Sequence, residues 1–85
     1  MKKHEWRENL PDGDVRFVSA VRQGGRWRFQ TRLKSEDEGT KLDTLPLEDL
    51  QVLRDLLWNK SQRRRVPLEQ VYEIDALIKL AEKHP

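Results

Sequence analysis

The sequence predicts a two-layer α+β fold, in which an antiparallel meander of three or four strands is followed by two helices packed on one face of the sheet. Apolar and polar residues alternate on either side of Gly24-Gly25, which predicts a β-hairpin over residues 15–34. Further along, two segments begin near a proline and then carry apolar side chains at helical spacing. A chain of 85 residues is long enough for one domain, so we expect residues 1–85 to form a single folded unit.

Composition restricts the class of protein. The chain has 17 Lys+Arg, 15 Asp+Glu, a formal net charge of +2 and no cysteine, which excludes a disulfide framework and a thiolate zinc site. No apolar stretch follows the charged first residues, as a secretory signal would require, and none approaches the roughly 20 residues of a membrane-spanning helix. We therefore expect a soluble, cytoplasmic protein without a membrane segment.

Residues 1–14 are predicted to form either an edge strand or a disordered arm. The sequence Leu10-Pro11-Asp12-Gly13 favours a turn, because proline presets φ, aspartate bonds to nearby backbone, and glycine accepts a positive φ. A strand before this turn would pair with the first half of the hairpin. A three-residue connection would place Trp6 on the arginine-bearing face of the sheet, and a four-residue connection would place it in the core.

Residues 15–44 are predicted to contain the hairpin and the rest of the meander. Pairing odd-numbered with odd-numbered residues places Phe17 opposite Leu33 and Val21 opposite Phe29, so that large apolar side chains share one face. This register requires a connection with an odd number of residues, such as Gly24-Gly25-Arg26. The other face then carries a row of four arginines, Arg16, Arg22, Arg28 and Arg32, with Arg26 and Lys34 at its ends.

A further strand is predicted within residues 40–44. It follows a polar turn that contains Glu36-Asp37-Glu38 and is closed by Gly39. Pairing Leu42 with Leu33 would place both leucines on the apolar face, which favours this register for the strand.

Residues 45–84 are predicted to form a pair of helices. Pro46 and Pro67 suit the first helical position, and the acidic residue two positions after each proline complements the helix dipole. Apolar side chains recur every three or four residues, as expected for helices that bury one side. The predicted stripes consist of Leu50, Leu53, Leu56 and Leu57 in the first helix, and of Val71, Ile74, Leu77, Ile78 and Ala81 in the second.

The sequence shows no arrangement typical of catalysis or metal binding. His4 and His84 are close to the chain ends, where a fixed general base or a preformed metal site is least expected. Gly24-Gly25 lacks the helix and the lysine of a phosphate-binding loop. We therefore predict a small, non-catalytic binding or accessory module that needs no cofactor and no metal ion.

The arginine row is the main candidate binding site. Guanidinium groups match phosphate in geometry and in charge, which favours nucleic acid as the partner. The run Arg63-Arg64-Arg65 would add to this surface if it lay on the same side of the molecule, although it also complements the dipole at the end of the first helix. Two other interpretations of the row stay open: an acidic protein partner, or a solvated face whose arginines pair with acidic neighbours.

A second candidate surface is apolar. Tyr72, Ala76 and Leu80 recur every four residues beside the main stripe of the second helix, and Trp58 has a similar position on the first. These residues indicate either a contact with a second copy or another protein, or the margin of a wide core. A protein-interaction module or homodimer, without a role in nucleic-acid binding, is therefore the alternative function.

Overall fold

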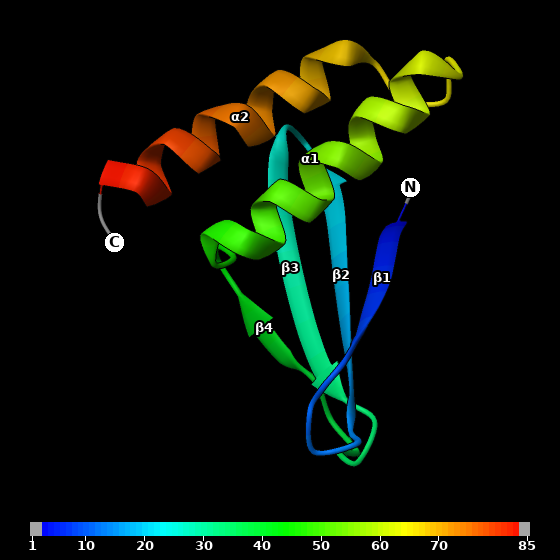
Figure 1. Cartoon of the computed structure of the whole chain (residues 1–85). Coiled ribbons are helices and arrows are strands. Elements are labelled where there is room, and N and C mark those ends of the chain that lie inside the picture. Colours follow the sequence, from blue (N-terminus) through cyan, green and yellow to red (C-terminus); the bar gives the residue numbers. More distant parts are fainter. Residues whose placement is uncertain (1–2, 84–85) are drawn as a thin grey trace. The chain divides into compact units, whose positions relative to one another are not determined.

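The computed structural model of the chain describes residues 3–83 (Figure 1). Four antiparallel strands precede two helices, which confirms the predicted α+β class. The described residues group into two compact units, the sheet up to Thr44 and the helical pair from Leu45. Of the two histidines, His84 lies outside the described residues. The elements are β1 (Lys3–Asn9), β2 (Val15–Gln23), β3 (Arg26–Leu33), β4 (Thr40–Leu42), α1 (Leu47–Gln62) and α2 (Leu68–Lys83).

The strands lie in the order β1-β2-β3-β4, so each one pairs with its neighbour in sequence (Figure 1). A three-residue turn connects β1 to β2. Leu10 donates its N–H to Asp14 O at 2.9 Å, and Gly13, with φ of 90°, donates to Leu10 O at 3.0 Å. β1 is thus an edge strand with a three-residue connection to β2. The expectation that this length would keep Trp6 out of the core is wrong, because the register places Trp6 opposite the buried Val18.

A two-residue turn, rather than the predicted three-residue connection, joins β2 to β3. Gly24 and Gly25 have φ values of 59° and 77°, and Gln23 pairs directly with Arg26. Positive φ at both central residues is typical of a type I′ turn, whose twist matches that of the flanking strands. Glycine adopts this conformation without a steric penalty, so Gly24-Gly25 favours the shorter turn.

The predicted pairing of odd-numbered with odd-numbered residues is consequently wrong. Phe17 lies opposite Arg32, and Val21 lies opposite Arg28, because the shorter connection shifts β3 by one residue. Successive side chains of a strand point to opposite sides of the sheet, so this shift exchanges the two faces of β3 relative to β2. The large apolar side chains are therefore divided, with Phe17 on one face and Phe29 on the other.

We name the two sides of the sheet after adjacent residues of β2, the Phe17 face and the Val18 face. No strand residue on the Phe17 face is buried within the described chain. The Val18 face carries the strand residues that are buried: His4, Val18, Ala20 and Phe29. The core of the sheet unit is thus on the Val18 face, and solvent reaches the Phe17 face.

β4 is short and pairs with a different part of β3 than predicted. Leu42 lies opposite Phe29 instead of Leu33, although it is on the same face of the sheet as Leu33, as predicted. The chain reverses early, because Glu36 N–H donates to Leu33 O at 2.9 Å and Leu33 N–H donates to Glu36 Oε1 at 2.9 Å. An earlier reversal matches each β4 residue with a β3 residue farther from the turn, which explains the difference.

Two connections at the same end of the sheet are joined by a side-chain hydrogen bond (Figure 1). Ser35 Oγ, after β3, donates to Asp14 Oδ2 at 2.5 Å, and Val15 N–H donates to Asp14 Oδ1 at 2.8 Å. The bond from Ser35 is the main reason why the pKa of Asp14 is lower than its ordinary value of 3.8.

Both helices bury one side. α1 begins at Leu47, so Pro46 precedes the helix instead of forming its first residue as predicted. Arg54 Nε donates to Asp75 Oδ1 at 3.1 Å, and this ion pair links the two helices. Neither helix of the described chain has the length and apolar character that spanning a bilayer requires. The buried residues are Asp49, Leu50, Leu53 and Leu57 in α1, and Val71 and Ile74 in α2.

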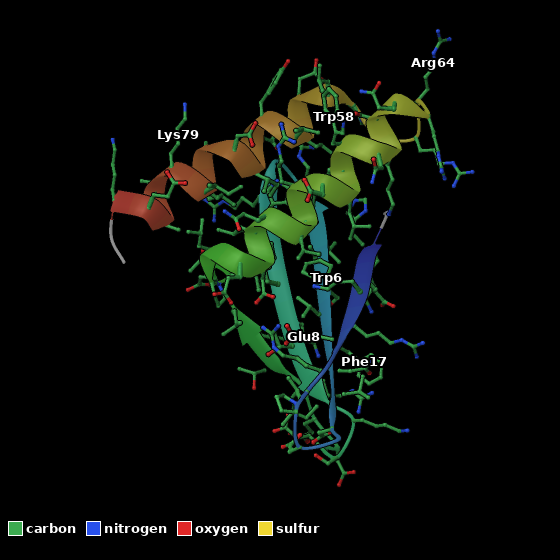
Figure 2. The ribbon with its side chains drawn as sticks, in the orientation of Figure 1. Trp6, Glu8, Phe17, Trp58, Arg64 and Lys79 are labelled. Atoms are coloured by element: carbon green, nitrogen blue, oxygen red, sulfur yellow. The ribbon has the colours of Figure 1, made fainter. Side chains whose placement is uncertain are left out.

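Three consecutive arginines form the turn after α1. Arg65 donates its backbone N–H to Lys60 O at 2.9 Å, and Arg64 donates to Ser61 O at 3.0 Å, the bonding pattern of a Schellman motif. Arg64 occupies the left-handed position of this motif, with φ of 58°. Glycine is the usual residue there, because a Cβ is disfavoured in this conformation. Figure 2 shows the Arg64 side chain extending away from the turn.

Candidate nucleic-acid interface

Basic side chains dominate the Phe17 face of the sheet. Among its strand residues, six are basic and one, Glu5, is acidic. Glu5 Oε1 lies 2.7 Å from Lys3 Nζ, so its charge is compensated within the face. Within residues 3–83, no acidic side chain forms an ion pair with Arg26 or Arg28. The basic residues of the face are Lys3, Arg7, Arg26, Arg28, Arg32 and Lys41.

Phe17 lies in a cross-strand row between Arg7 of β1 and Arg32 of β3. Arg32 Cζ is 5.0 Å from the centroid of the Phe17 ring, which is a cation–π contact. Arg32 Nη1 also donates to Glu36 O at 3.0 Å and to Leu33 O at 3.3 Å. The guanidinium group is therefore held over the ring from two sides, by the aromatic contact and by the turn after β3.

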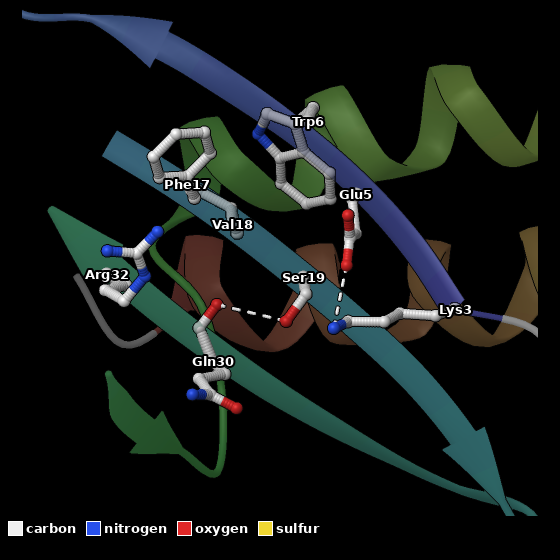
Figure 3. Close-up of a pocket in the computed structure, with 8 residues that line it drawn as sticks. All are labelled: Lys3, Glu5, Trp6, Phe17, Val18, Ser19, Gln30 and Arg32. Carbon is white, nitrogen blue, oxygen red and sulfur yellow. Dashed lines mark hydrogen bonds and ion pairs between the residues drawn. The ribbon is translucent and has the colours of Figure 1, made fainter. Parts of the chain in front are cut away.

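A hollow of about 240 Å³ lies beside this pair (Figure 3). Phe17 and Arg32 line it together with Trp6 and with two polar residues, Ser19 and Gln30. Ser19 Oγ donates to Gln30 O at 3.5 Å, a long bond between β2 and β3. The hollow thus combines an aromatic ring, a guanidinium group and polar atoms within the sheet unit.

A second hollow, of about 570 Å³, adjoins the first. Arg26, Arg28 and Lys41 contribute positive charge to its lining, and Asp43 contributes the acidic group. The two hollows are neighbours, because three residues line both of them: Lys3, Ser19 and Gln30. Basic residues line both hollows, and so do aromatic residues, which are Trp6 and Phe17 in the first and Trp27 and Phe29 in the second.

The arginine row that the sequence predicts is divided between the two faces. Arg28 and Arg32 lie on the Phe17 face, whereas Arg16 and Arg22 lie on the Val18 face. On that face Arg16 Nη1 is 3.9 Å from Glu8 Oε1. The two-residue turn causes the division, since it pairs even-numbered residues of β2 with odd-numbered residues of β3.

Sequence reasoning missed three basic residues of the Phe17 face: Lys3, Arg7 and Lys41. Their positions depend on the registers of β1 and β4, and these follow from the register of the central hairpin. The signal that could have found them is Gly24-Gly25, because two adjacent glycines between strands favour a two-residue type I′ turn.

The run Arg63-Arg64-Arg65 belongs to the helical unit, and its three residues are exposed. Its Schellman hydrogen bonds place it at the carboxyl end of α1, where positive charge complements the helix dipole. That it adds to the basic surface of the sheet stays a prediction.

The apolar candidate surface is exposed to solvent. Tyr72 and Leu80 are 60% and 56% exposed, and Ala76 between them is also exposed. Both sequence-based alternatives for these three residues, a contact with another chain and the margin of a wide core, stay predictions. Leu68, 37% exposed, extends the series by one turn, and Trp58 of α1 is 41% exposed.

His4 has a fixed position, which the sequence did not predict for a residue near the chain end. It is 2% exposed, and its ring centroid is 6.0 Å from that of Trp27. Pairing of β1 with β2 fixes His4 opposite Ala20 on the Val18 face. Across the part of the chain that the structure describes, no group of three or more side chains is arranged to hold a metal ion.

Comparison with known proteins does not identify a relative. No protein-family model, no curated protein and no solved structure matches the chain. The functional assignment therefore depends on the arrangement of the chain's own residues.

Proposed function

We propose that this chain is a non-catalytic module that binds nucleic acid, and that the Phe17 face contacts the phosphates. The observation that carries the proposal is the charge of this face, where six basic strand residues stand against one acid that is itself paired with Lys3. Arginine offers forked N–H donors that match phosphate oxygens, and each neutralised phosphate releases condensed counterions. A cytoplasmic location, expected from the sequence, is part of the same proposal.

The spacing of the basic groups supports contact with several phosphates. Arg26, Arg28 and Arg32 share one face of β3, and six residue steps separate the first from the last. At about 3.3 Å per step, these positions extend over roughly 20 Å. A nucleic-acid strand passes several phosphates over that length, so more than one guanidinium group can be engaged at once. Contacts to phosphate position a strand without reading its sequence, so we expect little sequence preference.

Two double variants test which face binds. Arg28→Ala with Arg32→Ala removes two positive charges from the Phe17 face, and Arg16→Ala with Arg22→Ala removes two from the Val18 face. Fluorescence anisotropy with labelled oligonucleotides at several salt concentrations measures the affinity and its salt dependence, and circular dichroism checks that each variant is folded.

The two variants have different expected results. The Phe17-face variant should lose affinity by a similar factor for every sequence, and the slope of log K against log salt should fall by about 1.4–1.8. The Val18-face variant should keep the slope of the unmodified chain. Equal losses in both variants would mean that net charge rather than this face determines binding. No binding to any oligonucleotide at low salt would refute the proposal.

A protein-interaction module is the alternative function, and the exposed apolar series on α2 favours it. Tyr72 and Leu80 are each more than half exposed, although such side chains are usually buried. If this surface forms a homodimer, the mass measured by light scattering should rise with concentration, and Leu80→Glu should abolish the rise. An acidic protein partner would instead compete with oligonucleotides for the Phe17 face.

A further inference from the structure

We infer that the Phe17 face binds single-stranded rather than duplex nucleic acid, and that an unpaired base stacks against the pair formed by Phe17 and Arg32. This inference rests on the proposed function, because it names the form of nucleic acid that the same face would select.

The position of Phe17 is the first reason. Its ring is half-buried on the face that solvent reaches, whereas the buried residues of the sheet are on the Val18 face. Its cross-strand neighbours are two arginines, so the ring is the aromatic centre of a basic row. Aromatic rings and guanidinium planes are the surfaces on which unpaired bases stack, and in a duplex the neighbouring base pairs already occupy the faces of each base.

The hydrogen bonds of Arg32 are the second reason. Both backbone bonds, to Leu33 O and to Glu36 O, use Nη1. A guanidinium group carries five N–H donors, so these two bonds hold the plane over Phe17 and leave donors of the other nitrogens for a ligand. A side chain that is already fixed loses less conformational entropy on binding, which favours Arg32 as part of a preorganised platform.

The lining of the two neighbouring hollows is the third reason. The 240 Å³ hollow beside Phe17 and Arg32 has polar lining groups from Ser19 and Gln30, which suit the polar edge of a base. The adjoining 570 Å³ hollow has a basic lining that includes Arg28 and Lys41, which suits the phosphates. A single strand can place a base in the first hollow and its backbone along the second.

Electrostatics alone would not select a single strand. The salt dependence per phosphate contact is steeper for a duplex than for a single strand, so a purely basic surface would bind a duplex at least as well. A preference for single strands therefore requires a contribution from the bases, and stacking on Phe17 and Arg32 supplies it.

Three labelled ligands of equal length test the inference with the unmodified chain. They are a single-stranded DNA of about a dozen nucleotides, the corresponding duplex, and a strand of the same phosphates that lacks the bases. We expect the single strand to bind more tightly than the duplex. We also expect it to bind at least about fivefold more tightly than the abasic strand, the lower end of what stacking one base on an aromatic side chain contributes.

Variants of Phe17 and Arg32 test the same point from the protein side. Phe17→Leu removes the ring and should lower the affinity for the single strand at least about fivefold while leaving the affinity for the abasic strand unchanged. Phe17→Tyr keeps the ring and should retain binding. Arg32→Lys keeps the charge but not the plane, and it should reduce the preference for the strand that has bases. Val15→Ala, which removes apolar atoms on the same face but outside both hollows, is the control.

The possible outcomes separate the inference from the proposed function. If the abasic strand binds as tightly as the normal strand, or the duplex binds more tightly than the single strand, the stacking inference is wrong while phosphate binding by the Phe17 face stands. If none of the three ligands binds at low salt, both are wrong. The ligand comparison needs no variant, so it decides the matter even if Phe17→Leu does not fold.

Discussion

Substitutions at Arg64 offer a test of the turn between the helices. Arg64 has φ of 58°, in a conformation where a Cβ costs about 1–2 kcal/mol. Glycine avoids this steric cost, but it loses more chain entropy on folding than alanine does, and this loss cancels about 0.5–1 kcal/mol of the advantage. Arg64→Gly should therefore be more stable than Arg64→Ala by about 0.5–1 kcal/mol. Both variants lack the guanidinium group, so the comparison isolates the backbone from the favourable charge at the end of α1.

The neighbouring residue supplies the control. Arg63 has φ of −94°, which any residue adopts, so Arg63→Gly should be less stable than Arg63→Ala. Urea denaturation followed by circular dichroism measures all four variants, and the expected difference at Arg64 corresponds to a midpoint shift of about 0.2–1 M. If alanine at position 64 is as stable as glycine, the reasoning about the left-handed position is wrong. Arg64→Gly should also remain folded, so its affinity for oligonucleotides tests the predicted contribution of Arg63-Arg64-Arg65.

Two further predictions concern stability. Leu53→Ala should lower the free energy of unfolding by about 2–5 kcal/mol because Leu53 is fully buried, whereas Val52→Ala, at a position 42% exposed, should cost much less; equal denaturation midpoints for the two variants would contradict this. Ser35→Ala should raise the pKa of Asp14 toward its ordinary value, because the Ser35 hydrogen bond is the largest cause of its lowering. A carboxyl group whose pKa is lower in the folded than in the unfolded chain stabilises the fold at pH values above its unfolded-state pKa. This stabilisation disappears as the pH falls through the folded-state pKa. The unmodified chain should therefore melt at a higher temperature than Ser35→Ala at about pH 7, and this difference should be smaller at about pH 2. A difference in melting temperature that does not change with pH would count against the prediction.

The type and order of the elements could be predicted from the sequence. The prolines and apolar spacing indicated two helices, and the structure has them at Leu47–Gln62 and Leu68–Lys83. The register of the hairpin could not be obtained from apolar alternation, because β2 has apolar residues at both odd and even positions. The turn sequence decides between the two possible registers, since Gly24-Gly25 adopts two consecutive positive φ values and thereby fixes a two-residue connection.

The candidate site was predicted in part for the same reason. Arg28 and Arg32 do share a face, but Arg16 and Arg22 belong to the opposite one. A one-residue error of register in one hairpin thus changed half of the proposed row. The contact between Arg32 and Phe17 also depends on the correct register, because the predicted one placed these residues on opposite faces.

Nuclear magnetic resonance of the arginine side chains during titration with a short single-stranded DNA tests the central claim most directly. The Nε–Hε signals of four arginines report on both faces of the sheet at once, because Arg28 and Arg32 lie on the Phe17 face and Arg16 and Arg22 on the Val18 face. If the Phe17 face binds nucleic acid, the signals of Arg28 and Arg32 shift with the added strand and those of Arg16 and Arg22 do not. Shifts confined to Arg16 and Arg22, or no shifts at low salt, would contradict the account.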